Sequence, residues 1–318
     1  MKKTNYIASA PATLKLLGEY AVLYDHLAIA CAVNYRITAV IKPRSDNKII
    51  ITSSIGNYET TIDSLCIIPA LSFVSASLLH FKQSLPGGCE ITIKEQFSAT
   101  LGLGSSAAVT VACLAAITMW LKLELSELEL LKIAHKVVLQ VQKIASGIDL
   151  AASIFGGIIS YCKEPLAVTK LVSNPKLSLV YSGKKTTTAK SISLVSDNFN
   201  SLNHIEKAIY NLIGDCTQEA VPLFIANDWR KLGLLFNIHH GLQEALGTGT
   251  EMLSQIVYKL RDCPGIFGAK ISGSGFGDCA IGLGEIATDT FPQNGQQNTL
   301  GIKQIPITIS NAGVIRHV

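Results

Sequence analysis

The sequence predicts a two-domain protein of the α+β class. Its 318 residues exceed the usual size of a single domain, and 48% hydrophobic against 16% charged residues predicts well-filled cores. Strand-like and helix-like segments occur in both halves, which favours antiparallel sheets with helices packed on them. The segment Lys163-Glu164-Pro165 interrupts this pattern. We therefore place an N-terminal domain at residues 1–163 and a C-terminal domain at residues 164–318.

In the N-terminal half, strands and helices are predicted from three kinds of pattern. Residues 27–33 are apolar at every position, which predicts a strand buried on both faces. Gly56 and Asn57 predict a hairpin turn. Ser126, with Glu129 three residues later, predicts a helix start with a capping box. The expected strands cover residues 5–17, 27–42, 49–52, 58–62, 90–94 and a segment after Gly157 that ends at Tyr161, and the expected helices cover 69–82, 105–123, 127–143 and 146–155.

The C-terminal half is predicted to contain more helix. The expected helices cover residues 202–214, 216–226, 228–245 and 248–261, and the expected strands cover 166–172, 177–182, 267–272, 279–283 and 303–309. Residues 293–298 are polar throughout and predict a mobile loop.

Composition and patterning argue against several classes of protein. The formal net charge is +4 and no Lys/Arg block occurs of the kind that follows a phosphate backbone, so we expect no nucleic-acid partner. The eight cysteines form no Cys-x-x-Cys pair and have no zinc-ligand spacing, which favours reduced core cysteines in a cytosolic protein. Residues 97–121 are uncharged, but the apolar run within them, 107–121, is shorter than the roughly 20 residues of a membrane span. We expect a cytoplasmic protein with no membrane segment and no signal peptide.

A glycine-serine loop precedes the most apolar of the predicted helices. Residues 101–108 read LGLGSSAA. The small residues let backbone N–H groups approach an anion, and the helix that follows aims its free N–H groups and its dipole at the same anion. Serine hydroxyls are oxygen ligands that Mg²⁺ accepts. No Lys-Ser/Thr pair closes the loop, so it is not a Walker A motif. The alternative is an ordinary helix start with serine caps.

A second glycine-rich segment lies near the C-terminus. Residues 268–279 read GAKISGSGFGDC, with glycines at positions 273, 275 and 277 between two strand-like segments. A Rossmann fingerprint fits poorly, because that motif follows the first strand of a βαβ unit and opens a helix. Two interpretations stay open: a glycine-rich hairpin, or a loop that closes over the active site beside the first loop.

Asp149 is an isolated carboxylate in apolar surroundings. It follows Ser146-Gly147-Ile148 and precedes Leu150. A buried carboxylate near a substrate hydroxyl can orient that hydroxyl and accept its proton. The alternative, which the local pattern favours, is a carboxylate in the first turn of a helix that the helix dipole stabilises.

These segments, in this order, make the chain similar to the GHMP kinases, named for galactokinase, homoserine kinase, mevalonate kinase and phosphomevalonate kinase. The order runs from Ala10-Pro11 and GEYAV at 18–22, through GLGSSA at 102–107 and SGID at 146–149, to the late glycine loop. Residues 18–30 resemble mevalonate kinases in length and rhythm, whereas Tyr20, where those kinases usually have His, resembles bacterial phosphomevalonate kinases. The resemblance implies an N-terminal domain similar to the ribosomal S5 domain 2-like fold and a ferredoxin-like C-terminal domain.

The same resemblance implies an activity and a set of site residues. It implies a small-molecule kinase that uses ATP and Mg²⁺ to phosphorylate mevalonate in isoprenoid precursor synthesis, and relatives that are commonly homodimers. Asp149 and Lys15 would be catalytic, and Ser106 would bind the magnesium ion. The implied ATP-binding residues are Leu101, Gly102, Leu103, Gly104, Ser105, Ser106 and Ala107. The implied substrate-binding residues are Glu19, Tyr20, Ser146, Gly147, Thr188, Gly273, Ser274 and Gly275.

Two positions depart from the mevalonate kinase pattern. The first-strand lysine of that pattern falls at Thr13 here, and Lys15, two residues further on and on the same face of a strand, is its candidate substitute. The alternative is a surface lysine at the strand end. The second magnesium carboxylate aligns near Val138, with only Gln140 and Gln142 nearby.

Two alternatives to a mevalonate kinase therefore stay open. The first is a phosphomevalonate kinase, in which Lys184 and Lys185 are the candidates to grip the second phosphate. The second is a catalytically impaired, nucleotide-binding relative.

Overall fold

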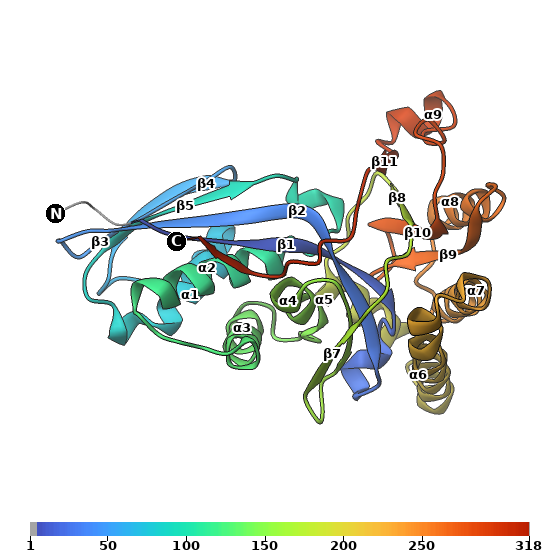
Figure 1. The fold of residues 1–318 in the computed structure, drawn as a ribbon, viewed down its shortest axis with the longest axis horizontal. Helices are drawn as coiled ribbons and strands as arrows, with labels where there is room; N and C mark the ends of the chain where they lie inside the picture. Colours follow the sequence, from blue (N-terminus) through green and yellow to red (C-terminus); the bar gives the residue numbers. More distant parts are fainter. Residues whose placement is uncertain (1–4, 318) are drawn as a thin grey trace.

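Two β-sheets and the helices packed on them make up the computed structural model, which describes residues 5–317 (Figure 1). The larger sheet has the strand order β12-β1-β2-β5-β3-β4, and β6 pairs with β2 and β7 to one side of this path. The smaller sheet has the order β11-β8-β10-β9. The two sheets follow one another along the long axis of the molecule (Figure 1). The α+β prediction is confirmed.

The larger sheet is built on its two longest strands, β1 (Tyr6–Leu17) and β2 (Ala28–Pro43), which pair antiparallel. Its other strands are β3 (Lys48–Ser53), β4 (Gly56–Thr61), β5 (Cys89–Glu95), β6 (Ile158–Cys162), β7 (Ala167–Leu171) and β12 (Ile315–His317). Helix α2 (Ser105–Trp120) packs on β1 and β2 and is enclosed by α1 (Ser72–His80), α3 (Glu127–Gln142) and α4 (Ile148–Phe155). This enclosure explains why α2 is apolar around its whole circumference.

The C-terminal half of the described chain contributes five helices and the smaller sheet. The strands of this sheet are β8 (Leu177–Tyr181), β9 (Ile266–Ser272), β10 (Cys279–Gly284) and β11 (Lys303–Ile305), all antiparallel. The helices are α5 (Thr188–Asn198), α6 (Asn203–Ala226), α7 (Trp229–Ala245), α8 (Glu251–Arg261) and the short α9 (Gly295–Thr299). Short 3₁₀ turns cover Ala21–Tyr24, Pro69–Leu71, Lys82–Ser84 and Ala99–Leu101.

Most predicted elements are present, including the hairpin of β3 and β4 and the capping box at Ser126 and Glu129. The predicted break between 214 and 216 is wrong, because α6 runs through it. Gly214 lies inside this helix, where a Cβ would come 2.3 Å from Nδ1 of His26. The glycine thus permits close packing and does not end the helix.

Three other predictions of local structure need correction. Helix α5 was not predicted, because Ser191 and Val195 are its only buried residues and leave little apolar periodicity. The polar segment 293–298 contains the start of α9, which Asn294 caps. The predicted last strand is shorter, and a further strand, β12, pairs with Ile7–Ser9 of β1.

The predicted domain boundary lies within a hydrogen-bonded part of the larger sheet. Strand β7, after Pro165, pairs with β6, and β12 returns from the end of the chain to β1. The larger sheet therefore contains residues from both sides of the boundary, and the boundary itself stays a prediction.

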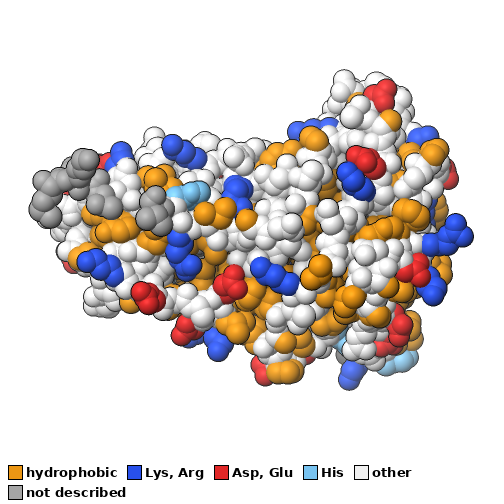
Figure 2. All heavy atoms as spheres, in the orientation of Figure 1, with side chains coloured by type: hydrophobic (Ala, Val, Ile, Leu, Met, Phe, Trp, Pro, Cys, Tyr) orange, Lys and Arg blue, Asp and Glu red, His pale blue; other side chains and the backbone are white. Residues whose placement is uncertain are grey.

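The surface charges are mixed and the cysteines are free, as the composition predicts. On the face in Figure 2, Lys and Arg side chains are scattered among acidic, polar and apolar ones. All eight cysteines are free, and Cys31, Cys89, Cys113 and Cys279 are buried. Within residues 5–317, no helix combines the length and the apolar character needed to cross a membrane.

Candidate active site

Three side chains from two distant segments meet near the end of strand β1. Thr13 and Lys15 point to the same side of β1 because strand residues alternate between faces. Asp149 lies in the first turn of α4, which Gly147 introduces with a left-handed φ of 88°. Thr13 Oγ1 donates a hydrogen bond of 3.0 Å to Asp149 Oδ1. Lys15 Nζ lies 2.5 Å from Asp149 Oδ2.

Lys15 is held in its charged form. Burial tends to lower the pKa of Lys15, but the carboxylates of Asp149, Glu19 and Asp278 together more than offset this, and the pKa is raised. The candidate substitute for the first-strand lysine is therefore an ammonium ion in contact with Asp149, and its side chain is 20% exposed.

The glycine-serine loop lies directly beside this pair. Gly102 and Gly104 have left-handed φ angles of 70° and 63°, and α2 begins at Ser105. A Cβ at position 104 would lie 2.1 Å from Thr13 Oγ1, so only glycine fits there without displacing Thr13. The first N–H groups of α2 therefore open next to Lys15 and Asp149, as an anion-binding helix N-terminus requires.

Two cavities meet at this point. The larger cavity is lined by Gly102, Gly104, Ser105, Lys185 and Gly273, together with apolar residues of β2, α1 and α2. The smaller cavity is lined by Glu19, Tyr20, Ala107, Ser146 and Gly147, together with apolar residues that include Val22, Leu150 and Ile192. Six residues line both cavities: Lys15, Ser106, Gln142, Asp149, Thr188 and Ser274. The Lys15–Asp149 pair thus stands where a ligand in one cavity would touch a ligand in the other.

Both halves of the chain match descriptions of one protein family. Residues 72–157 match "GHMP kinases N terminal domain", and residues 220–289 match "GHMP kinases C terminal". The mevalonate kinase of Thermococcus sibiricus is 32% identical over 87% of this chain and 88% of its own, and that of Pyrococcus furiosus is 33% identical over the same shares. The chain belongs to the GHMP kinase family.

Solved structures share the fold of this GHMP kinase. The mevalonate kinase of Methanococcus jannaschii has a TM-score of 0.79 at 23% identity, covering 97% of this chain and 99% of that one. A Streptococcus pneumoniae phosphomevalonate kinase in complex with phosphomevalonate and AMPPNP has a TM-score of 0.79 at 17% identity, covering 98% and 99%. Sequence identities this low establish the fold and leave the substrate open.

Most residues that the sequence nominated for ligand binding in this GHMP kinase line one of the two cavities, but three do not. Leu103 is buried in the hydrophobic core, and Leu101 packs against that core. Gly275 lies against Thr248, whose carbonyl oxygen would be 2.4 Å from a Cβ at position 275. These three residues shape the two glycine loops and do not line the cavities.

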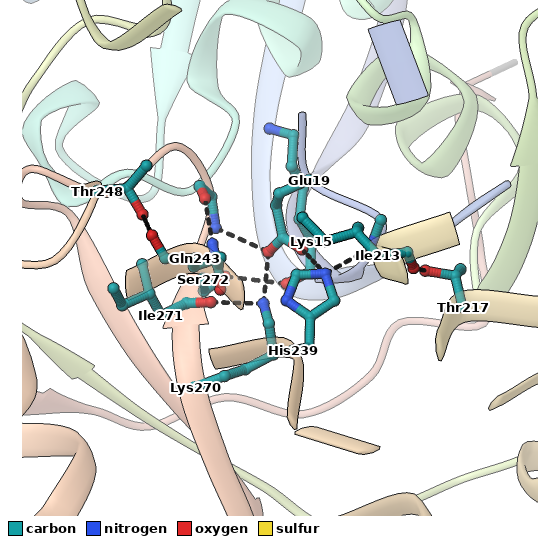
Figure 3. A network of polar contacts seen from close by, with 12 residues as sticks. Lys15, Glu19, Ile213, Thr217, His239, Gln243, Thr248, Lys270, Ile271 and Ser272 are labelled. Carbon is teal, nitrogen blue, oxygen red and sulfur yellow. Dashed lines mark hydrogen bonds and ion pairs between the residues drawn. The ribbon is translucent and has the colours of Figure 1, made fainter. Parts of the chain in front are cut away.

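Glu19 has a structural environment that the sequence did not predict. Its side chain is 2% exposed, and Oε1 lies 2.6 Å from Lys270 Nζ and accepts a 3.1 Å hydrogen bond from the Gly273 N–H (Figure 3). Burial tends to raise the pKa of Glu19, but Lys270, with smaller contributions from His239 and a backbone hydrogen bond, more than offsets this and the pKa is lowered. Glu19 therefore ties the end of β1 to the late glycine loop, although it also reaches the smaller cavity.

His239 completes this network as a neutral ring. Burial, followed by the charge of Lys270, lowers the pKa of His239 to about 3. The Gly18 N–H donates to Nε2 at 3.0 Å, so Nε2 carries no proton. The 3.3 Å approach of Nε2 to Glu19 Oε2 is therefore not an ion pair.

Tyr20 and Thr188 both line the smaller cavity. Tyr20 OH donates a 2.5 Å hydrogen bond to Ser274 O, which joins the substrate end of β1 to the late glycine loop. Thr188 is the first residue of α5, a helix that Thr187 caps by accepting a hydrogen bond from Lys190 N. Helix α5 thus carries a predicted site residue even though the helix itself was not predicted.

Sequence reasoning missed Asp278 and Gln142 as cavity residues. Asp278 lines the larger cavity and is 8% exposed, and its Oδ1 has no hydrogen-bond partner. Burial raises the pKa of Asp278 to about 6, against the opposing charges of Lys185 and Lys15. The available signal was a charged residue at the end of a glycine run, directly before a strand.

Proposed function

We propose that this GHMP kinase transfers the terminal phosphoryl group of ATP to the hydroxyl of mevalonate. The observation that supports it is the Lys15–Asp149 pair at the junction of the two cavities. ATP occupies the larger cavity, with its phosphates on the N–H groups of residues 102–106, and the acceptor occupies the smaller cavity. The curated mevalonate kinases that the chain resembles support this choice of acceptor.

Asp149 orients the acceptor hydroxyl and accepts its proton as the new O–P bond forms. Thr13 holds one carboxylate oxygen of Asp149, which fixes the direction of the other. Lys15 contacts the other carboxylate oxygen of Asp149 and stabilises the negative charge that develops on the transferred phosphoryl group. Little covalent chemistry is asked of the protein, because phosphoryl transfer depends on position and on charge neutralisation.

Oxygen atoms of the larger cavity fit a magnesium ion. Ser106 lines both cavities, and Asp278 presents a buried oxygen that has no hydrogen-bond partner. Among residues 5–317, no group of three His, Cys, Asp or Glu side chains is placed to hold a metal ion. This arrangement suits Mg²⁺, which usually binds through few protein oxygens and the phosphates of its nucleotide. The ion would neutralise charge on those phosphates.

The charge of the smaller cavity favours mevalonate over phosphomevalonate as acceptor. Of the described residues that line it, Lys15 alone carries a positive charge, and Lys15 is paired with Asp149. Lys185 lines the larger cavity instead, and Lys184 lines neither. A second phosphate on the acceptor would therefore find no separate cation. The cytoplasmic location, expected from the cysteines and the apolar runs, and the homodimer, implied by the resemblance, stay predictions.

The test is ADP release by the purified protein with Mg-ATP, comparing mevalonate with 5-phosphomevalonate. We expect turnover on mevalonate and its near-complete loss in Asp149→Asn. Turnover on phosphomevalonate alone would move the chain to the next reaction, and an Asp149→Asn variant with nearly full turnover would remove Asp149 from its role. Silence with both acceptors, together with nucleotide binding, would favour the impaired relative.

A further inference from the structure

Asp278 occupies a backbone position that disfavours most side chains. Its φ is +59°, in the left-handed region, and the residue before it is Gly277. Both sides of its peptide backbone are fixed, because Asp278 N–H donates to Lys184 O at 2.7 Å and Asp278 O accepts from Ser182 N–H at 2.8 Å. The backbone that carries this carboxylate is therefore held in place without a ligand.

The Asp278 side chain packs against the glycine-serine loop of residues 101–106. A Cβ on Gly102 would lie 2.9 Å from both Cβ and Cγ of Asp278, so the carboxylate lies flush against the first glycine of the loop. Ser105 and Ser106 line the same cavity. A carboxylate beside a site for phosphates is repulsive in a water-poor cavity unless a cation lies between them.

Asp278 differs from the other carboxylates that line the larger cavity, because one of its oxygens is buried without a hydrogen-bond partner. The described carboxylates lining the larger cavity are Glu95, Asp149 and Asp278. Glu95 accepts a hydrogen bond from Ser54, and Asp149 is engaged by Lys15 and Thr13. Asp278 is faced by Lys185, Lys15 and Asp149, yet its Oδ1 is buried without a hydrogen-bond partner.

We propose that Asp278 is a carboxylate ligand of the divalent cation that accompanies the nucleotide, and that it takes the place of the magnesium carboxylate that is absent near Val138. The proposal rests on the proposed function, since the cation enters with the nucleotide. Ser106 and the nucleotide phosphates supply further ligands, which is a usual composition for a Mg²⁺ site. Two loops far apart in the sequence would then close on one ion.

The probe is Mn²⁺, whose binding is followed by electron paramagnetic resonance of the free ion in the presence of protein and ADP. Asp278→Asn keeps the shape of the side chain and tolerates a left-handed φ, and Asp278→Gly relieves the backbone entirely. The matched control is Asp25→Asn, which changes an aspartate of φ 65° that lines neither cavity. ADP affinity is measured in parallel with EDTA present, by calorimetry.

We expect the Asp278 variants to bind Mn²⁺ more weakly but metal-free ADP more tightly. Both Asp278 variants should bind Mn²⁺ in the ADP complex at least about tenfold more weakly, since even residues behind metal ligands change affinity by about 10–100-fold. In EDTA they should bind ADP more tightly than the unchanged protein, because a negative charge beside the phosphates is gone. Asp25→Asn should change neither quantity.

Other outcomes overturn the proposal. Unchanged Mn²⁺ affinity in both Asp278 variants would show that the carboxylate does not ligate the ion. Parallel weakening of ADP with and without metal would show a structural role. If the unchanged protein binds no ADP at all, the proposed function fails as well, whereas ADP binding with Mn²⁺ affinity independent of Asp278 overturns this inference alone.

Discussion

Lys15 Nζ lies 2.5 Å from Asp149 Oδ2, although 134 positions separate the two residues in the chain. The contact places the ammonium ion two residues beyond the position where mevalonate kinases carry theirs, on the same face of β1. Thr13, at the usual position, contributes a hydrogen bond to the same carboxylate. The strand therefore supplies both a charge and a hydroxyl to one acidic group.

Removing this charge should slow the chemical step. Lys15→Met is expected to lower kcat by about 10²–10³-fold, the usual cost of losing one group that stabilises transition-state charge. Steady-state ADP release measures it. Lys48→Met is the control, because Lys48 lies on β3 and its Glu59 partner is solvent-exposed. A Lys15→Met variant that keeps most of its turnover would contradict the assigned role.

Breaking the Glu19–Lys270 ion pair should lower the free energy of unfolding. Both side chains are buried, so Glu19→Gln leaves an uncompensated ammonium ion and should cost about 3–5 kcal/mol of unfolding free energy. Urea denaturation measures this loss. The double variant Glu19→Gln/Lys270→Met should recover part of it, because no buried charge is left. Glu59→Gln, at an exposed pair, is the control, and equal losses in Glu19→Gln and Glu59→Gln would refute the argument.

Two buried histidines should make the fold less stable in acid. Burial lowers the pKa of His239 to about 3 and that of His240 to about 4, so both are neutral in the folded chain. Unfolded histidine takes up a proton near pH 6.5, so the unfolded state binds more protons between about pH 6.5 and 4. The contribution of these two rings to stability should therefore fall as the pH falls through this window, by a few kcal/mol on the order-of-magnitude scale of such shifts.

Thermal unfolding between pH 7.5 and 4.5 measures this dependence. His239→Gln should flatten the curve, because it removes one of the two buried rings. The exposed His204 provides the control, since His204→Gln should leave the slope unchanged. Identical slopes in all three proteins would show that the buried ring of His239 is not responsible.

Gly104 should not tolerate a side chain. Its φ is +63° and a Cβ would lie 2.1 Å from Thr13 Oγ1. Gly104→Ala should cost about 1–2 kcal/mol from the left-handed backbone alone, and it should lower kcat by pushing Thr13 away from Asp149. Adding Thr13→Ala should recover stability, since Oγ1 is the atom in the way. Gly241→Ala, inside α7 where a Cβ would meet nothing within 4 Å, should be neutral or stabilising. Full activity in Gly104→Ala would contradict the geometry.

The sequence by itself determined the local elements of the site. Period-two alternation placed Thr13 and Lys15 on one face of a strand. A glycine-serine run before an apolar segment indicated the start of α2, and the turn at Gly147 put Asp149 in the first turn of a helix. These features depend on neighbours within a few residues, so a single sequence is sufficient to show them.

Only the tertiary structure decided which charged side chains have a partner and which have an oxygen without one. The partners of Glu19 come from α7, β9 and the late glycine loop, more than 200 positions away. They give this expected substrate residue a buried ion pair with Lys270, while it also lines the smaller cavity. The same packing buries Asp278 against Gly102 and leaves one of its oxygens without a partner. Burial sets the cost of an unpaired charge. This burial arises when distant segments fold onto one another, so no local pattern in the sequence predicts it.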